Sequence, residues 1–289
     1  MNLFELFEDI EKADPEFQDR ISPRRDAIKN MTSFGSKVAV AALPFAFSEL
    51  LKKAYGQVPS SAVLATLNFA LKLEYFEAAF YRTGLAQASL VVPTSDRTNI
   101  LAPIAAHEVS HVNFLKTALG TNAVAQPADS SYDFTAGGAF ATVFTNYATF
   151  LAVAQVLEDT GVRAYKGQAG VLLKDQTYLT AALNIHSVEA RHASAIRYLR
   201  RTTISGASAT KPWISLGTGN VANDTGISTV DGNYASENNT MQGSPAVDIT
   251  KLPGVSANST ISLSAAVEAF DEPLTMAQVL NLVAPFHVS

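Results

Sequence analysis

The sequence predicts an all-α fold: an antiparallel four-helix bundle with an N-terminal helical extension and a loop-rich C-terminal tail. Apolar residues recur at helical spacing in four long segments. These segments cover residues 60–87, 96–119, 137–167 and 173–202. Stretches rich in Pro, Gly, Asp and Ser separate them, and long helices joined by short links pack as antiparallel neighbours.

The composition is that of a globular protein with a large buried core. The chain has 289 residues, of which 47% are hydrophobic and 16% charged, and its net charge is −5. This charge gives no attraction for nucleic acid, so we expect no nucleic-acid partner. The absence of cysteine excludes disulfides, metal sites built from thiolates, and a cysteine nucleophile.

The N-terminal extension, residues 1–58, carries a pattern typical of an export signal. The string SPRRDAIK (22–29) is followed by the apolar run VAVAALPFAF (38–47), which resembles a twin-arginine signal. This run is too short for a stable membrane span. The long acidic segment before Arg24 and the lack of an A-x-A cleavage site depart from the signal pattern. We expect a periplasmic protein exported by this route; the alternative is a cytoplasmic protein with a basic turn before a helix.

The bundle is predicted to occupy residues 59–202, and the tail residues 203–289. The tail is rich in Gly, Ser, Thr and Asn up to about residue 264, which indicates loops, with short strands, that either lie over the bundle or are partly disordered. Trp213 is expected to anchor it there. Two short helical patterns, 262–270 and 274–283, close the chain.

Each of the four long helices has an apolar stripe that is interrupted near its middle. The interrupting residues are Glu74, then Glu108 and His111, then Glu158, then Glu189 and His192. A single ionised carboxylate in a bundle core costs several kcal/mol when it is unpaired. Two divalent cations would balance four carboxylates, and neutral imidazoles would complete their coordination.

The pattern also repeats within the chain. Glu74-x6-Tyr81 matches Glu158-x6-Tyr165, and the Glu-x-x-His pair at 108–111 matches the pair at 189–192. Two helical hairpins related by a pseudo-twofold axis would each place half of a metal site at the centre of the bundle.

Several strings in residues 60–202 resemble the ferritin-like superfamily: LNFALKLEYFEAAFY, AAHEVSHVNFL, LEDTGVRAY and SVEARHASAIRYLR. Within it they are similar to a bacterial branch that includes exported proteins and relatives of plant desiccation-related proteins. The resemblance implies six metal ligands: Glu74, Glu108, His111, Glu158, Glu189 and His192. It further implies that Glu108 and Glu189 bridge the metals, and that Tyr81 and Tyr165 lie beside them as candidate catalytic residues.

The resemblance implies a protein that holds two iron or manganese ions and reacts with O₂ or H₂O₂. Ferroxidase, catalase-like and oxidase activities all use this kind of ligand set. Relatives are commonly dimers, so a homo-oligomer is also expected. The alternative is a structural or stress-protective bundle with little catalytic turnover.

The string HEVSH, residues 107–111, has a second interpretation as a zinc-peptidase motif. His107 and His111 would then bind zinc and Glu108 would act as the general base. The extended motif is absent, because Phe114 and Thr117 stand where glycine and the third histidine belong. A zinc metallopeptidase is therefore the remote alternative.

Four further residues have more than one interpretation. Glu77 lies three residues from Glu74 and can face the same way, although the repeat favours Glu74 as the ligand. His107 is expected beside the ligands or at the surface, and His186 in the core or beside the ligands. Asp159 is expected on the outer face of its helix, where it would cap or pair.

Overall fold

The computed structural model describes residues 59–217, 228–252 and 260–287. The predicted export signal and the N-terminal helical extension, residues 1–58, lie outside these ranges.

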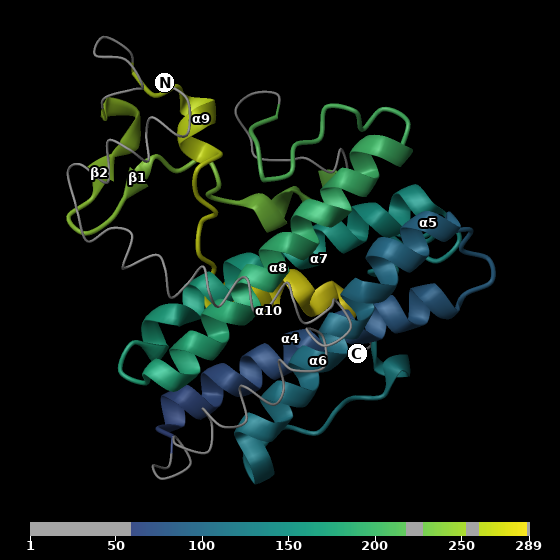
Figure 1. Ribbon diagram of the computed structural model, residues 1–289, viewed down its shortest axis with the longest axis horizontal. Helices are drawn as coiled ribbons and strands as arrows, with labels where there is room; N and C mark the ends of the chain where they lie inside the picture. The colour runs from purple at the N-terminus through teal and green to yellow at the C-terminus, as the bar shows by residue number, and fades with distance from the viewer. Residues whose placement is uncertain (1–58, 218–227, 253–259, 288–289) are drawn as a thin grey trace, which may run out of the picture. The chain divides into compact units, whose positions relative to one another are not determined.

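Four long helices form the bundle and confirm the predicted fold class (Figure 1). They are α4 (Ser61–Ala86), α6 (Ala102–Leu119), α7 (Tyr147–Ala169) and α8 (Gln176–Thr203). Helix α4 packs mainly against α6, and α7 mainly against α8. The side chains of Ser60, Asn146 and Asp175 each accept a hydrogen bond from a first-turn backbone N–H, which fixes where α4, α7 and α8 begin.

The prediction for the third helix was wrong at its N-terminal end, which lies at Tyr147 and not near residue 137. Gly137 and Gly138 have φ values of 67° and 93°, so the chain turns there. Phe140 and Val143 are nevertheless buried, because this turn-rich segment packs into the core. The spacing of these apolar residues matches that of a helix, which explains the wrong prediction.

The link between α6 and α7 is a long crossover. The C-terminal halves of α6 and α7 lie at the same end of the bundle as the N-terminal halves of α4 and α8. Residues 120–146 must therefore run the length of the bundle before α7 begins. Each sequence-adjacent helix pair, α4–α6 and α7–α8, is antiparallel, while α6 and α7 are parallel.

The remaining elements are short. Helix α5 (Thr94–Asp96) and a π-helical turn (Arg97–Leu101) lead into α6. In the tail, strands β1 (Met241–Gln242) and β2 (Val247–Asp248) pair antiparallel, and helices α9 (Leu263–Val267) and α10 (Met276–Val283) follow. Single 3₁₀ turns occupy Gly120–Asn122, Asp129–Ser131, Gly170–Leu172, Ser228–Tyr234, Ile249–Lys251 and Ala284–Phe286.

The described part of the tail packs on α7. The backbone N–H of Leu274 donates to the carbonyl of Arg163 at 3.1 Å. Gly167 permits this approach, because a Cβ there would lie 1.9 Å from the Leu274 carbonyl oxygen. Trp213, by contrast, is half-exposed and donates to Glu268 at 3.0 Å, a contact within the tail itself.

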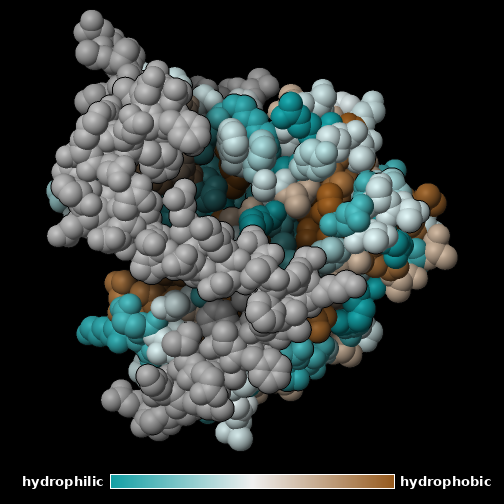
Figure 2. All heavy atoms as spheres, viewed as in Figure 1, coloured by the Kyte–Doolittle hydropathy of each residue, from teal (hydrophilic) through white to brown (hydrophobic). Residues whose placement is uncertain are grey.

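Hydrophobic and hydrophilic residues alternate over the coloured surface in Figure 2. Within the described ranges, no helix combines the length and the apolar character needed to cross a membrane.

Candidate metal centre

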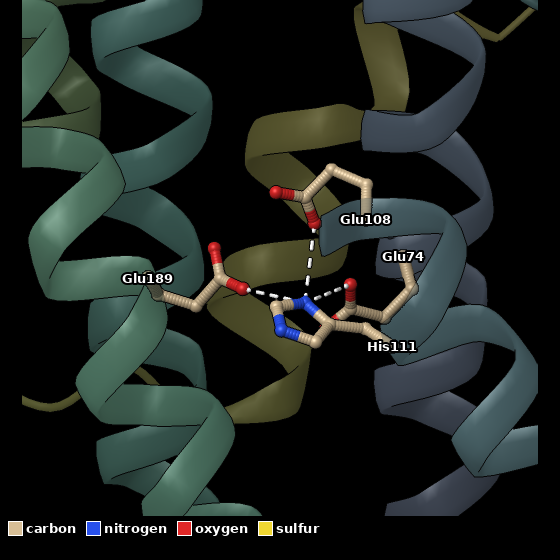
Figure 3. A group of neighbouring side chains, drawn as sticks. All are labelled: Glu74, Glu108, His111 and Glu189. Atoms are coloured by element: carbon tan, nitrogen blue, oxygen red, sulfur yellow. Dashed lines mark hydrogen bonds and ion pairs between the residues drawn. The ribbon is translucent and has the colours of Figure 1, made fainter. Parts of the chain in front are cut away.

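The first cluster of ligand-type side chains surrounds His111 (Figure 3). Its Nδ1 atom lies 3.1 Å from a carboxylate oxygen of Glu74, 3.3 Å from one of Glu108 and 3.0 Å from one of Glu189. All four residues are buried, and they come from α4, α6 and α8. Three helices therefore direct three carboxylates towards one imidazole nitrogen.

The second cluster surrounds His192 in the same manner. Its Nδ1 atom lies 2.8 Å from Glu108, 3.3 Å from Glu158 and 3.9 Å from Glu189. Glu108 and Glu189 belong to both clusters, whereas Glu74 and Glu158 belong to one each. The structure thus brings all six predicted ligands together and places the two carboxylates of the Glu-x-x-His pairs between the two imidazoles.

The donor atoms of these residues fit two divalent cations. Within each cluster the ligand atoms lie within 4.8 Å of one another. In the described part of the chain, both carboxylate oxygens of Glu108 and of Glu189 accept no hydrogen bond of ordinary geometry, although imidazole nitrogens lie close. Buried carboxylate oxygens are normally satisfied, and a bound cation would satisfy them here. Carboxylates with one imidazole per metal suit iron or manganese.

Burial and mutual charge set the protonation of the site. Burial raises the pKa of Glu189 well above its ordinary value and that of Glu74 to about 7. Burial also raises the pKa of Glu108, but the two facing imidazoles outweigh it and bring this pKa below its ordinary value. The pKa of His192 rises to about 11, because nearby carboxylates outweigh burial, which lowers it. The centre therefore strongly attracts positive charge.

The two tyrosines of the repeat bind the glutamates reciprocally. The hydroxyl of Tyr81 on α4 donates to Oε1 of Glu158 on α7, and the hydroxyl of Tyr165 on α7 donates to Oε1 of Glu74 on α4. Each tyrosine thus orients the carboxylate of the opposite hairpin. This exchange agrees with the pseudo-twofold relation that the sequence repeat predicts.

His107 and Glu77, whose roles the sequence did not decide, lie next to the clusters. Nδ1 of His107 lies 2.9 Å from Nε2 of His192, so it contacts the ring nitrogen opposite the one that faces the carboxylates. Glu77 is buried, and its Oε1 would lie 3.1 Å from a Cβ placed on Gly161. His186 is half-buried and belongs to neither cluster.

Asp159 was expected on the outer face of α7, and this prediction was wrong. It is buried, its carboxylate pairs with Arg197 at 2.5 Å, and it accepts a hydrogen bond from Tyr234 at 2.7 Å. One turn further along α7, buried Arg163 pairs with Glu237 of the tail at 2.6 Å. The spacing of Asp159 and Arg163 on a single helix face was the available signal.

The geometry does not match the zinc-peptidase interpretation. That interpretation needs His107 and His111 on one ion, with Glu108 left to act as a base. Glu108 instead belongs to both clusters, and His107 belongs to neither.

The fold and the site, with one Glu-x-x-His pair on each of two helices, are compatible with a helical bundle of the dinuclear carboxylate type. The comparison with protein families agrees: the family described as ferritin-like domain matches residues 62–202. This region of the chain is a ferritin-like domain. Comparisons with curated proteins and with solved structures gave no match.

Proposed function

We propose that this protein holds two iron or manganese ions and reacts with O₂ or H₂O₂. The observation that carries the proposal is the sharing of Glu108 and Glu189 between the two clusters. Carboxylates shared in this way would hold two ions close together. Such a pair of ions supplies redox chemistry towards dioxygen or peroxide.

The protein's own residues would set the reactivity of these ions. Glu74 and Glu158 each offer one carboxylate to a single ion, and the tyrosine hydroxyl of the opposite hairpin fixes its orientation. The apolar bundle around the clusters keeps bulk water away and strengthens the electrostatic interactions of the bound charges.

The deciding experiment is elemental analysis of natively purified protein beside the double variant Glu108→Ala/Glu189→Ala. We expect about two iron or manganese ions per chain, as in other dinuclear carboxylate bundles, and their loss in the double variant. Glu237→Gln is a matched control, because Glu237 is equally buried but lies in the tail pair with Arg163. One zinc per chain that survives Glu189→Ala would favour a peptidase instead.

Absence of metal even after reconstitution would contradict the proposal and favour the structural or stress-protective alternative. The desiccation-related branch, the export route and a homo-oligomeric state stay predictions from sequence.

Metal uptake should also release protons. Burial raises the pKa of Glu74 to about 7, and nearby carboxylates raise the pKa of His192 to about 11. Near neutral pH Glu74 is therefore partly protonated and His192 protonated, and a cation must displace these protons. Affinity is therefore expected to rise with pH. Calorimetric titration with Mn²⁺ in two buffers of different ionisation enthalpy measures the protons released, and equal heats in both buffers would contradict this prediction.

A further inference from the structure

A small cavity lies within the bundle, at the end where α4 and α8 begin. Its volume is about 20 Å³, and all four helices contribute to its walls. The walls are mostly apolar and include Leu67, Ala70, Leu115, Leu172, Ala182 and Ile185. Thr66, Gln168 and the tyrosines at 165 and 178 are the polar members of the lining.

The cavity lies about one helical turn from the first metal cluster. Ala70 precedes Glu74 by four residues, Leu115 follows His111 by four, and Ile185 precedes Glu189 by four. Residues four apart share a helix face and differ in height by about 6 Å. Each of these three ligands therefore has a cavity-lining neighbour directly beside it on its own helix.

Tyr165 connects the cavity to the cluster. Its ring lines the cavity, while its hydroxyl donates to Glu74. Towards the outside, Phe114 and Gln168 are the two lining residues that are half-exposed, so solvent reaches the cavity's surroundings on their side. A small molecule held here has the protein surface on one side and the Glu74 ligand on the other.

The size and lining of the cavity select the molecule that it can hold. A volume of about 20 Å³ admits one small molecule and is too small for an organic substrate. A buried water or peroxide needs several hydrogen-bond partners, and mostly apolar walls provide few. Apolar cavities in proteins stay dry and bind apolar gases such as xenon.

We propose that this cavity is a binding site for O₂ that serves the first metal cluster, and hence that O₂ is the oxidant used by the protein. The claim that O₂ is the oxidant rests on the proposed dinuclear function. The claim that a gas binds beside the cluster rests on the cavity alone.

Xenon tests the gas site without any need for activity. Methyl NMR of the full chain under xenon pressure should show saturable shifts at Ala70, Leu115 and Ile185. Ala70→Val fills the cavity and should abolish these shifts. Ala78→Val is the matched control, because Ala78 is also buried on α4, one turn to the other side of Glu74. Ala182→Val is a second filling variant in case the first does not fold.

Stopped-flow mixing of Fe²⁺-loaded protein with O₂ or with H₂O₂ tests delivery. Filling the cavity should slow the reaction with O₂ severalfold and leave the reaction with H₂O₂ and the bound metal unchanged. Ala78→Val should leave both rates unchanged.

Absence of saturable xenon shifts overturns the gas site. Equal O₂ rates in the filled and control variants, or a reaction with H₂O₂ alone, overturn delivery of O₂. If the protein binds metal and consumes neither oxidant, the proposed function fails, while the xenon result still decides whether the gas site exists.

Discussion

The two helical hairpins of the bundle supply matching ligands but different surroundings. Each contributes one terminal glutamate, one Glu-x-x-His pair and one tyrosine that reaches across to the other. Beyond these residues the match ends. Gly161 on α7 stands where α4 has Glu77, and Val188 on α8 stands where α6 has His107. The repeat therefore preserves the candidate metal ligands, and the residues around them would make two bound ions inequivalent.

The inequivalence has a physical basis on each side of the site. A fifth buried carboxylate at the site, Glu77, faces Gly161 on α7, where an added Cβ would lie 3.1 Å from its Oε1. An extra imidazole, His107, lies 2.9 Å from Nε2 of His192. The O₂ cavity lies beside Tyr165 and the first cluster. We expect the first ion to be the one that meets the oxidant.

The largest effect should come from removing a shared ligand instead of a terminal one. Glu189→Ala takes a carboxylate from both clusters, so we expect the metal content to fall from about two ions per chain to nearly none. Glu158→Ala takes a ligand from the second cluster alone and should leave about one ion. Elemental analysis after dialysis measures both. Equal losses in the two variants would show that the clusters are not joined through Glu189.

The second prediction compares two arginine pairs, one on each hairpin. Arg163 and Glu237 are fully buried, and the arginine also donates to the carbonyl of Glu272 at 2.8 Å. Arg163→Ala leaves a buried carboxylate unpaired and should lower the free energy of unfolding by about 3–5 kcal/mol. On α4, Arg82 pairs with Asp129 while both side chains are 43% exposed, so Arg82→Ala should cost about 0–1 kcal/mol.

Urea denaturation of the two variants measures this difference. Similar losses would mean that the tail contributes no more to the stability of the α7–α8 hairpin than a surface pair contributes to α4–α6.

The third prediction compares Tyr81 and Tyr165, the two tyrosines related by the pseudo-twofold axis. Tyr81→Phe and Tyr165→Phe each remove one hydroxyl donor from a glutamate of the opposite hairpin. Hydrogen bonds to charged groups contribute about 1.5–3 kcal/mol, so both variants should lose similar stability. Tyr165 orients Glu74, the glutamate next to the cavity, so a change in O₂ rate at constant metal content should appear in Tyr165→Phe alone. A matching rate change in Tyr81→Phe would contradict the asymmetry.

The features that the sequence predicted well are those that obey helical spacing. The extents of α4, of α8 and of the helical run that ends with α6, and the grouping of the six candidate ligand residues, followed from apolar stripes interrupted at their middles. These interruptions indicate a site because a buried charge costs free energy unless it has a partner. The beginning of α7 was predicted wrongly. Phe140 and Val143 are buried at a spacing that resembles a helix, but they lie in a turn-rich segment that follows Gly137 and Gly138.

The residues around the ligands depend on contacts between distant segments. Asp159 was placed on the outer face because nothing nearby in sequence indicates the tail that covers it. Its partners Arg197 and Tyr234 lie 38 and 75 residues away. The cavity was equally unpredictable, since it depends on the shapes of side chains from four helices and not on their polarity.

The smallest predicted effect concerns Glu77 and Gly161, which occupy corresponding positions in the two hairpins. Gly161→Ala improves helix propensity by about 1 kcal/mol. Its new Cβ, however, would lie 3.1 Å from Oε1 of Glu77 and 3.4 Å from Oε2 of Glu189. The crowded carboxylate must shift, so we expect little or no net gain while Glu77 is present.

Removing the crowding should recover the gain. In a Glu77→Ala background, Gly161→Ala should stabilise the protein by the full propensity difference of about 1 kcal/mol. A double-mutant cycle of thermal unfolding measures this coupling. A coupling energy near zero would show that Glu77 adjusts freely beside Gly161, and the asymmetry between the hairpins would then rest on His107 and the cavity.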